Sequence, residues 1–161
     1  AMSYGILAIA AAKEAKAGAS LEKVAEVVRE SIPWMHLLIV LDTLKYVVRG
    51  GRLGKPYGLL GSVLKVKPLL TLRDGKLVLA GVARTRAKAI KRLYDFVEGF
   101  PQVSDVAVSY TTSKEEAEAL AEQIKANFPD IPLYFTRIGP VLGTHAGPGA
   151  MGVAVRETGN K

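Results

Sequence analysis

The chain has 161 residues, of which 49% are hydrophobic and 23% charged, proportions typical of a globular protein with one well-packed domain. It contains no cysteine, which excludes a disulfide framework and thiol catalysis, and with two histidines neither a metal nor a cofactor is expected. The net charge is +7, concentrated in one segment, which indicates a site rather than a general surface bias.

Two helices are predicted before the first strand. Residues 4–17 form an Ala-rich run, and Ser20 is suited to cap a second helix that must end before Pro33. The apolar faces of these helices need a sheet to cover, and no strand precedes them. The apolar run 6–12 is too short for a membrane span and lacks the context of a signal peptide. We therefore expect a cytoplasmic protein.

A buried strand and two short helices are predicted next. Residues 37–41 are a continuous apolar run with β-branched members, which is typical of a buried strand. A helix then starts near Asp42 and ends at Gly50 and Gly51, because glycine adopts the positive φ that helix ends prefer. Residues 58–66 are expected to form a second short helix.

The rest of the chain predicts a hairpin followed by alternating helices and strands. Asp74 and Gly75 separate two apolar runs, 69–72 and 77–83, and this dipeptide favours a tight hairpin turn. The later elements are expected to be helix 85–98, strand 103–110, helix 114–127, and strands 131–136 and 151–155. The predicted fold class is α/β, a two-layer domain with a mixed sheet of about six strands and helices mainly on one face.

Positive charge is concentrated between Asp42 and Arg92, where 13 Lys and Arg residues stand against two acids. Arg84 and Arg86 fall at the expected start of a helix, an end that already carries positive partial charge. This placement favours a nearby anion, since guanidinium groups bind carboxylate or phosphate in a bidentate manner. Together with Arg52, they predict an anion-facing patch on one face. The alternative is a helix end followed by solvated arginines.

A second unusual stretch, residues 139–149, is rich in glycine and contains Thr144 and His145. We expect it to be a loop whose backbone N–H groups can approach an anion closely, while the imidazole adds a donor that titrates near neutral pH. The alternative is a plain connecting loop. His36, beside an apolar strand, is expected to be structural.

Together these stretches resemble the DegV family of bacterial proteins, which bind long-chain fatty acids. The family pattern contains Gly-Gly-Arg, Lys-Pro, a Gly-Lys hairpin, Arg-x-Arg at a helix start, and Gly-x-x-x-Gly-Thr-His-x-Gly-Pro-Gly. The same blocks occur here in the same order, within residues 43–52, 61–68, 74–76, 84–86 and 139–149.

The resemblance implies a function and a set of site residues. This chain would hold a long-chain fatty acid and present its carboxylate to a separate ATP-dependent fatty acid kinase, which makes acyl phosphate, so the chain itself would not be an enzyme. The residues implied at the carboxylate end or the partner-docking surface are Arg52, Arg84, Arg86, Thr144 and His145. Those implied along the acyl chain are Gly5, Ile6, Leu7 and Ile9.

The resemblance covers only about the C-terminal half of the family's usual length. It implies a truncated form in which residues 1–34 are a helical remnant of a first, lipid-binding domain with a parallel sheet. Residues 35–161 would be the C-terminal DegV-type α/β domain. Surface exposed by such a truncation would favour self-association.

The alternative function is a basic nucleic-acid-binding α/β module, because phosphate backbones attract segments of high positive charge. Against it, the basic segment holds few aromatic residues, Tyr46 and Tyr57, and no nucleic-acid-binding motif. No nucleophile–base pair or carboxylate pair stands out, so the residues alone do not indicate an enzyme.

Overall fold

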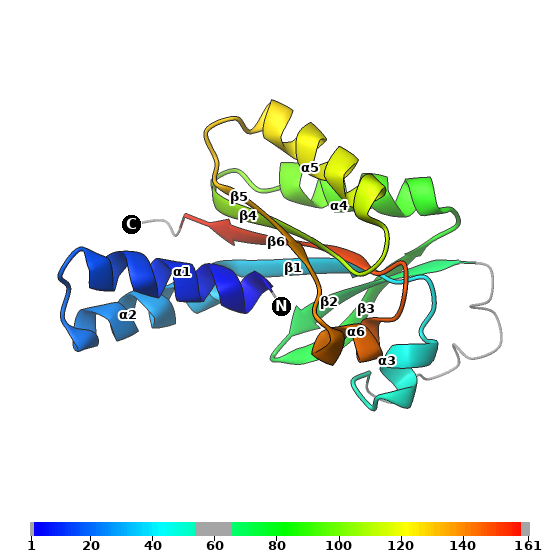
Figure 1. Ribbon diagram of the computed structural model, residues 1–161, viewed down its shortest axis with the longest axis horizontal. Helices are drawn as coiled ribbons and strands as arrows, with labels where there is room; N and C mark the ends of the chain where they lie inside the picture. The colour runs from blue at the N-terminus through cyan, green and yellow to red at the C-terminus, as the bar shows by residue number, and fades with distance from the viewer. Residues whose placement is uncertain (1, 54–65, 159–161) are drawn as a thin grey trace.

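In a computed structural model that describes residues 2–53 and 66–158, a six-stranded sheet forms the centre of the molecule (Figure 1). The strand order is β3-β2-β1-β6-β4-β5. β4 and β5 are parallel and all other neighbours are antiparallel, so the predicted mixed sheet is confirmed. The strands are β1 (Met35–Val40), β2 (Lys67–Arg73), β3 (Lys76–Ala83), β4 (Val103–Tyr110), β5 (Leu133–Arg137) and β6 (Met151–Glu157).

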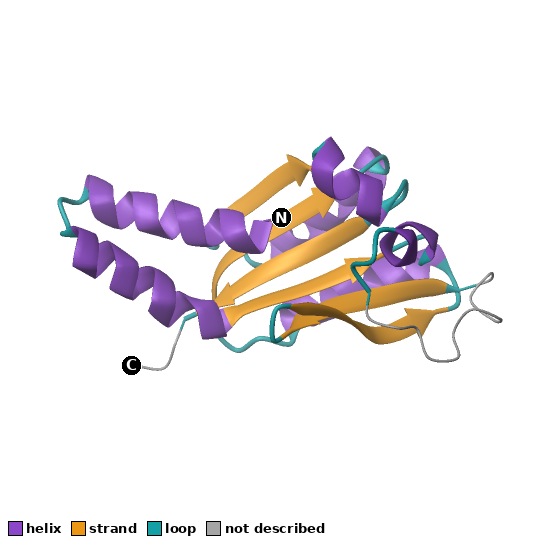
Figure 2. Ribbon diagram, turned by 90° about the horizontal axis from the view of Figure 1, so that it is seen from below, coloured by secondary structure: helices purple, strands orange, loops and turns teal. Residues whose placement is uncertain are grey.

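Helices lie on both faces of this sheet, which corrects the expectation that they lie mainly on one (Figure 2). One face is covered by α4 (Arg86–Glu98) and α5 (Lys114–Asn127). The other carries α1 (Met2–Lys16), α3 (Lys45–Arg49) and α6 (Pro140–Ala146), and α2 (Leu21–Ser31) packs on α1 and leads through the short η1 (Ile32–Trp34) into β1. The physical reason is that the central strands are apolar on both faces, as the buried neighbours Val153 and Ala154 show.

The larger core lies between the sheet and helices α4 and α5. Leu93 of α4 and Leu120 of α5 are fully buried against the valines of β4 and β6. Thr85 begins α4 as an N-cap, with its hydroxyl accepting a hydrogen bond from the backbone N–H of Lys88. This side of the sheet is therefore fully packed.

The hairpin prediction is confirmed. β2 and β3 are antiparallel neighbours, and Arg73 pairs with Lys76 across a two-residue turn. Asp74 and Gly75 both have positive φ, 50° and 73°, as tight hairpin turns require.

Two other predictions need comment. Residues 139–149 were expected to be a loop, but most of them form α6, with Pro140 at its first turn and Gly147 ending it at φ 78°. Proline at this position is compatible with a helix start. The sequence interpretation gave more weight to the glycines, which favour a loop. The helix predicted at 58–66 lies outside the described residues.

The first two helices pack on the same sheet as the rest of the chain. Ile6 of α1 is 1% exposed and packs against Ala107 of β4 and Ala154 of β6. A helical remnant of a missing parallel-sheet domain is therefore not supported, because α1 already covers a sheet face. Self-association is likewise unsupported, and the division of the chain at residue 35 stays a prediction.

Replacing Ile6 with alanine tests whether α1 belongs to this packed unit. We expect Ile6→Ala to lower the free energy of unfolding by about 2–5 kcal/mol, because it leaves a cavity against the sheet. Ile32→Ala is the matched control, since Ile32 is 55% exposed and should change that free energy by less than about 0.5 kcal/mol. Urea unfolding measures both, and equal effects would contradict the packing.

Candidate functional site: an apolar pocket beside α3 and α6

A pocket of about 340 Å³ lies on the sheet face opposite α4 and α5. This volume falls in the range of small-molecule sites, about 300–1,000 Å³. Its floor is formed by strand residues, namely Leu37, Ile39, Leu70, Leu72, Ser109, Gly152 and Ala154. Its walls come mainly from the start of α1, from α3 and from α6, including Met2, Val47, Val141, Leu142 and Ala146.

Three polar side chains belong to the described lining: Arg52, Ser109 and His145. Arg52 follows α3, is exposed, and donates from Nη1 to the carbonyl oxygen of Gly50 at 3.0 Å. His145 lies in the last turn of α6 and is half-buried. The pocket is therefore an apolar body with a guanidinium and an imidazole in its lining.

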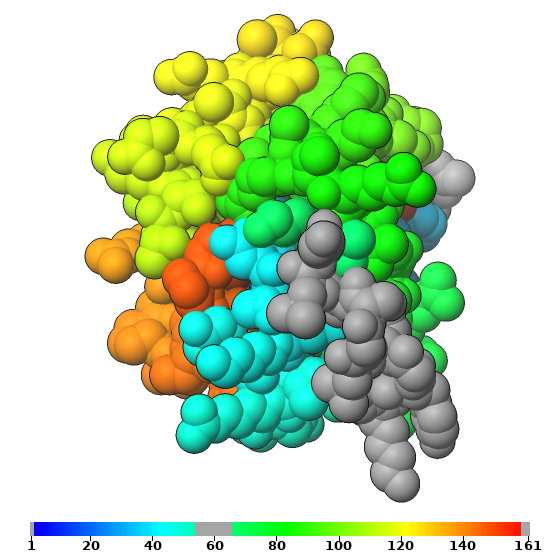
Figure 3. Space-filling model, turned by 90° about the vertical axis from the view of Figure 1, so that its right-hand side faces the viewer, coloured from blue at the N-terminus to red at the C-terminus, as the bar shows by residue number. Residues whose placement is uncertain are grey.

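The imidazole is brought there by a close approach between α3 and α6, which lie side by side (Figure 3). Gly50 ends α3, and a Cβ at this position would lie 2.1 Å from Nδ1 of His145. The backbone of the Gly-Gly-Arg turn thus packs directly on the histidine ring. Two motifs that are about 90 residues apart in the chain form one site.

The same approach continues at Tyr46 in α3 and at Asp42 before it. A Cβ on Gly147 would lie 2.3 Å from the ring of Tyr46. A Cβ on Gly149 would lie 2.3 Å from the carboxylate of Asp42. Together these contacts bring α3 and Asp42 against the chain that runs from His145 to Gly149. Of the glycines in the second motif, Gly147 and Gly149 are required by these contacts.

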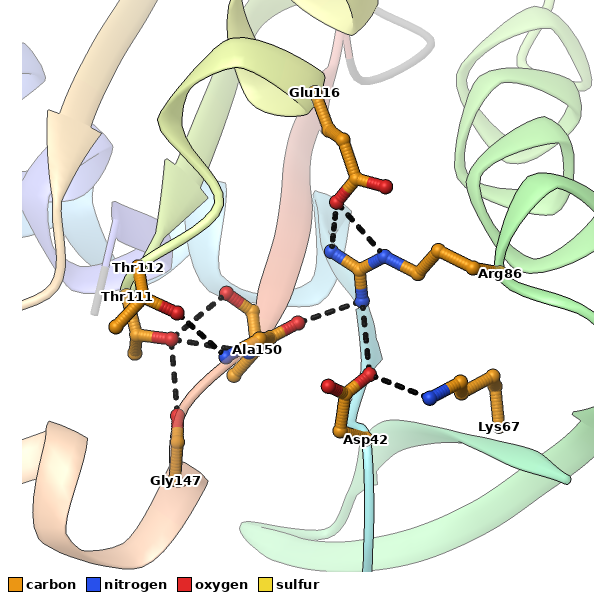
Figure 4. A network of polar contacts seen from close by, with 9 residues as sticks. Asp42, Lys67, Arg86, Thr111, Thr112, Glu116, Gly147 and Ala150 are labelled. Carbon is orange, nitrogen blue, oxygen red and sulfur yellow. Dashed lines mark hydrogen bonds and ion pairs between the residues drawn. The ribbon is translucent and has the colours of Figure 1, made fainter. Parts of the chain in front are cut away.

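Hydroxyl groups at the end of β4 hold the other side of that chain (Figure 4). Oγ1 of Thr111 donates to the carbonyl oxygen of Gly147 at 2.9 Å and accepts from the N–H of Ala150 at 3.0 Å. Oγ1 of Thr112 accepts from the N–H of Gly149 at 2.9 Å. The segment 147–150 is therefore fixed at both of its ends.

The other predicted anion-facing residues do not join Arg52 and His145. Arg84 is exposed on the turn between β3 and α4, outside the pocket lining. Arg86 forms ion pairs with two carboxylates, those of Asp42 and Glu116. Thr144 is exposed, and its hydroxyl donates to the carbonyl oxygen of Val141 at 3.0 Å. The predicted patch is thus divided between a pocket and an internal network.

The first helix contributes to the pocket at a different residue from those predicted. Met2 lines the pocket, whereas Ile6 is buried one turn later on the sheet. Gly5 lies beside the sulfur of Met2, and Leu7 and Ile9 are half-buried outside the lining. Sequence reasoning also missed the strand residues of the floor, although apolar residues on both faces of the central strands were the available signal.

His36, in β1, is not part of the pocket lining and has structural partners. Its Nε2 lies 2.7 Å from Oε2 of Glu157, and its ring stacks on Phe100 with centroids 4.5 Å apart. Among residues 2–53 and 66–158, no group of three or more His, Cys, Asp or Glu is placed to hold a metal ion. Within the same ranges, no helix is long and apolar enough to cross a membrane.

These observations define the chain as an α/β domain with an apolar ligand pocket beside a guanidinium and an imidazole. The family model described as "Uncharacterised protein, DegV family" matches residues 1–158. The chain belongs to the DegV family, as the sequence resemblance indicated.

Relatives of known sequence and structure agree. A DegV domain-containing protein of Clostridium acetobutylicum is 38% identical over 157 residues, which cover 95% of this chain and 54% of the relative. The structure resembles DegV, a fatty acid binding protein of Bacillus subtilis, with 32% identity, a TM-score of 0.83, and coverage of 98% and 57%. A fatty acid binding DegV family protein of Streptococcus agalactiae has 28% identity, a TM-score of 0.84, and coverage of 96% and 56%. The chain therefore spans little more than half the length of these relatives.

Adding a methyl group at Gly50 tests the contact that places His145. We expect Gly50→Ala to displace the imidazole and to lower the free energy of unfolding by about 1–3 kcal/mol. Gly143→Ala is the matched control, because Gly143 is helical in α6 and a Cβ there meets no atom within 4 Å. The NMR signal of the His145 Cε1–H group and thermal unfolding measure the two effects. An unchanged His145 signal in Gly50→Ala would contradict the contact.

Proposed function

We propose that this chain binds a long-chain fatty acid in the apolar pocket, with the carboxylate directed to Arg52 and His145. The observation that carries the proposal is the composition of the pocket: apolar side chains from the sheet and three helices, with one guanidinium and one imidazole. The two solved relatives described as fatty acid binding proteins support it.

The chemistry of the lining suits such an amphiphile. Burial of an acyl chain stabilises the complex by about 0.8 kcal/mol for each methylene group removed from water. The carboxylate suits Arg52, whose exposed guanidinium offers charge-assisted hydrogen bonds. His145 adds an imidazole N–H donor to the lining.

We further propose that the carboxylate end is presented to a partner, a fatty acid kinase, as the family resemblance implies. In this arrangement the chain is a lipid-binding subunit and the kinase supplies the chemistry. Arg52 and α6 form an accessible edge of the pocket, with Val141 80% exposed and Leu142 45% exposed. A partner can reach the carboxylate at this edge while the tail stays buried on the sheet. A cytoplasmic location stays a prediction.

The alternative of a nucleic-acid-binding module is not supported. Arg86 and Lys67, two cations of the basic segment, are neutralised by Asp42 and Glu116 in the structure. Phosphate binding would have to compete with these ion pairs, which lowers the attraction that the sequence suggested.

A charge in the apolar wall tests fatty acid binding. We expect Leu142→Glu to weaken palmitate binding by about tenfold, because a carboxylate at this edge of the pocket replaces apolar lining and repels the ligand carboxylate. The matched control is Leu21→Glu, at a 79% exposed position on α2 outside the pocket. Titration with palmitate, together with lipid extraction of the purified protein, measures both variants. Equal binding by the two variants, or no binding by the unmodified protein, would contradict the proposal.

Two alanine substitutions separate lipid retention from chemistry at the carboxylate. We expect His145→Ala and Arg52→Ala to lower acyl-phosphate formation with the kinase partner by about a hundredfold, since positioned donors act on the reacting group. Lipid retention should fall much less, because tail burial supplies most of the affinity. Co-purifying lipid and kinase-coupled turnover are measured side by side with the unmodified protein. Normal turnover with lost lipid would show that the roles are reversed.

A further inference from the structure

Arg86, at the start of α4, is enclosed by groups from three other segments of the chain (Figure 4). Its Nε donates to Oε2 of Glu116 on α5 at 3.0 Å, and Nη2 makes an ion pair with the same oxygen at 2.8 Å without hydrogen-bond alignment. Its Nη1 donates to the carbonyl oxygen of Gly149 at 2.6 Å and lies 3.5 Å from Oδ1 of Asp42. The side chain is only 19% exposed.

The charges in this network are balanced. Asp42 also accepts from Nζ of Lys67 at 2.9 Å, so two carboxylates face two cations. Because its charge is paired with Glu116 and Asp42, Arg86 attracts a ligand anion less strongly than a free arginine would. The contact that remains to be explained is the bond from Arg86 to the backbone of Gly149.

Gly149 connects this network to the segment that carries His145. It lies four residues after His145, and its missing Cβ admits the Asp42 carboxylate that Arg86 also contacts. The N–H of Gly149 is bound by Thr112, so Arg86 and Thr112 hold the two polar groups of one peptide segment. The short chain between Gly149 and His145 packs on Tyr46 at Gly147, so the two residues belong to one packed segment.

We propose that Arg86 is a positioning residue, which ties the carbonyl of Gly149 to α5 and to Asp42 and so fixes where His145 lies in the pocket. The guanidinium suits this task because its planar fork reaches Glu116 and the carbonyl at the same time, in fixed directions. A lysine has one ammonium group and keeps the charge without this geometry.

The role of His145 in ligand binding rests on the proposed function. The tether, meaning the hydrogen bond from Arg86 to the carbonyl of Gly149, does not. Its consequences appear in the ligand-free chain, so its failure and the failure of fatty acid binding are measured separately. The chain has two histidines, and His36, which is not part of the pocket lining, serves as an internal reference.

The first experiment records the Cε1–H signals of both histidines and the hydrogen exchange of the Gly149 amide in Arg86→Gln. We expect the His145 signal to shift while that of His36 stays. Gly149 should exchange about tenfold to a hundredfold faster, because its carbonyl is no longer held by Arg86 and its N–H then separates more often from Thr112. Lys88→Gln is the matched control, since it removes the same charge from an exposed position on α4. It should leave both signals and the exchange rate unchanged.

Two further variants keep the test decisive if Arg86→Gln folds poorly. Arg86→Lys keeps the charge and should still shift His145, which a purely electrostatic role would not produce. Glu116→Gln removes the charge that pairs with Arg86 but leaves the hydrogen bond to Gly149. We therefore expect a smaller shift of the His145 signal, in the same direction as in Arg86→Gln. The proposal is overturned if His145 stays unmoved in all three variants, or if His36 moves as much as His145.

Finally, palmitate titration links the tether to the pocket. We expect Arg86→Lys to bind palmitate several-fold more weakly than Lys88→Gln, in proportion to the His145 shift. If His145 shifts and palmitate binding is unchanged, the tether acts on the histidine alone and its proposed role at the pocket is wrong.

Discussion

The constraint on which the site depends is the close approach of α3 and the segment that follows α6. A glycine of one segment packs against a side chain of the other at three places. Gly50 packs against His145, Gly147 against Tyr46, and Gly149 against Asp42. Any Cβ at these glycines would stand within 2.3 Å of its neighbour, so the two segments could not meet as they do. Because of this contact the Gly-Gly-Arg turn and the histidine share one pocket edge.

The two faces of the sheet differ in how they are packed, and the pocket lies on the less filled face. Its α4–α5 face is filled by branched apolar side chains of full size, and these include Val108 and Leu93, both 0% exposed. Its other face carries small residues at the centre, such as Gly152 and Ala154, below short helices that do not cover it fully. The smaller side chains on this second face leave room for the pocket. A ligand can therefore occupy the second face without disturbing the larger core.

Charge is distributed by pairing. In the sequence, Arg86 belongs to a basic segment and falls at a helix start. Both features indicate a nearby anion, because the helix start already carries positive partial charge. In the fold, that anion is Glu116, 30 residues later, together with Asp42, which lies just after β1. Arg52 lies at the pocket, which explains why one arginine of the basic segment suits a ligand and another supports the backbone.

The sequence by itself determined the helices and strands whose signals are local. Apolar periodicity placed α5 and β4, and the Asp74–Gly75 dipeptide placed the hairpin, because propensity and turn chemistry act within a few residues. It also indicated the family, through motifs in a fixed order. Only the tertiary structure decided that helices cover both faces, that Met2 rather than Ile6 reaches the pocket, and that Arg86 is paired internally. These features depend on which distant groups meet across the sheet, and neither spacing nor charge along the chain contains that information.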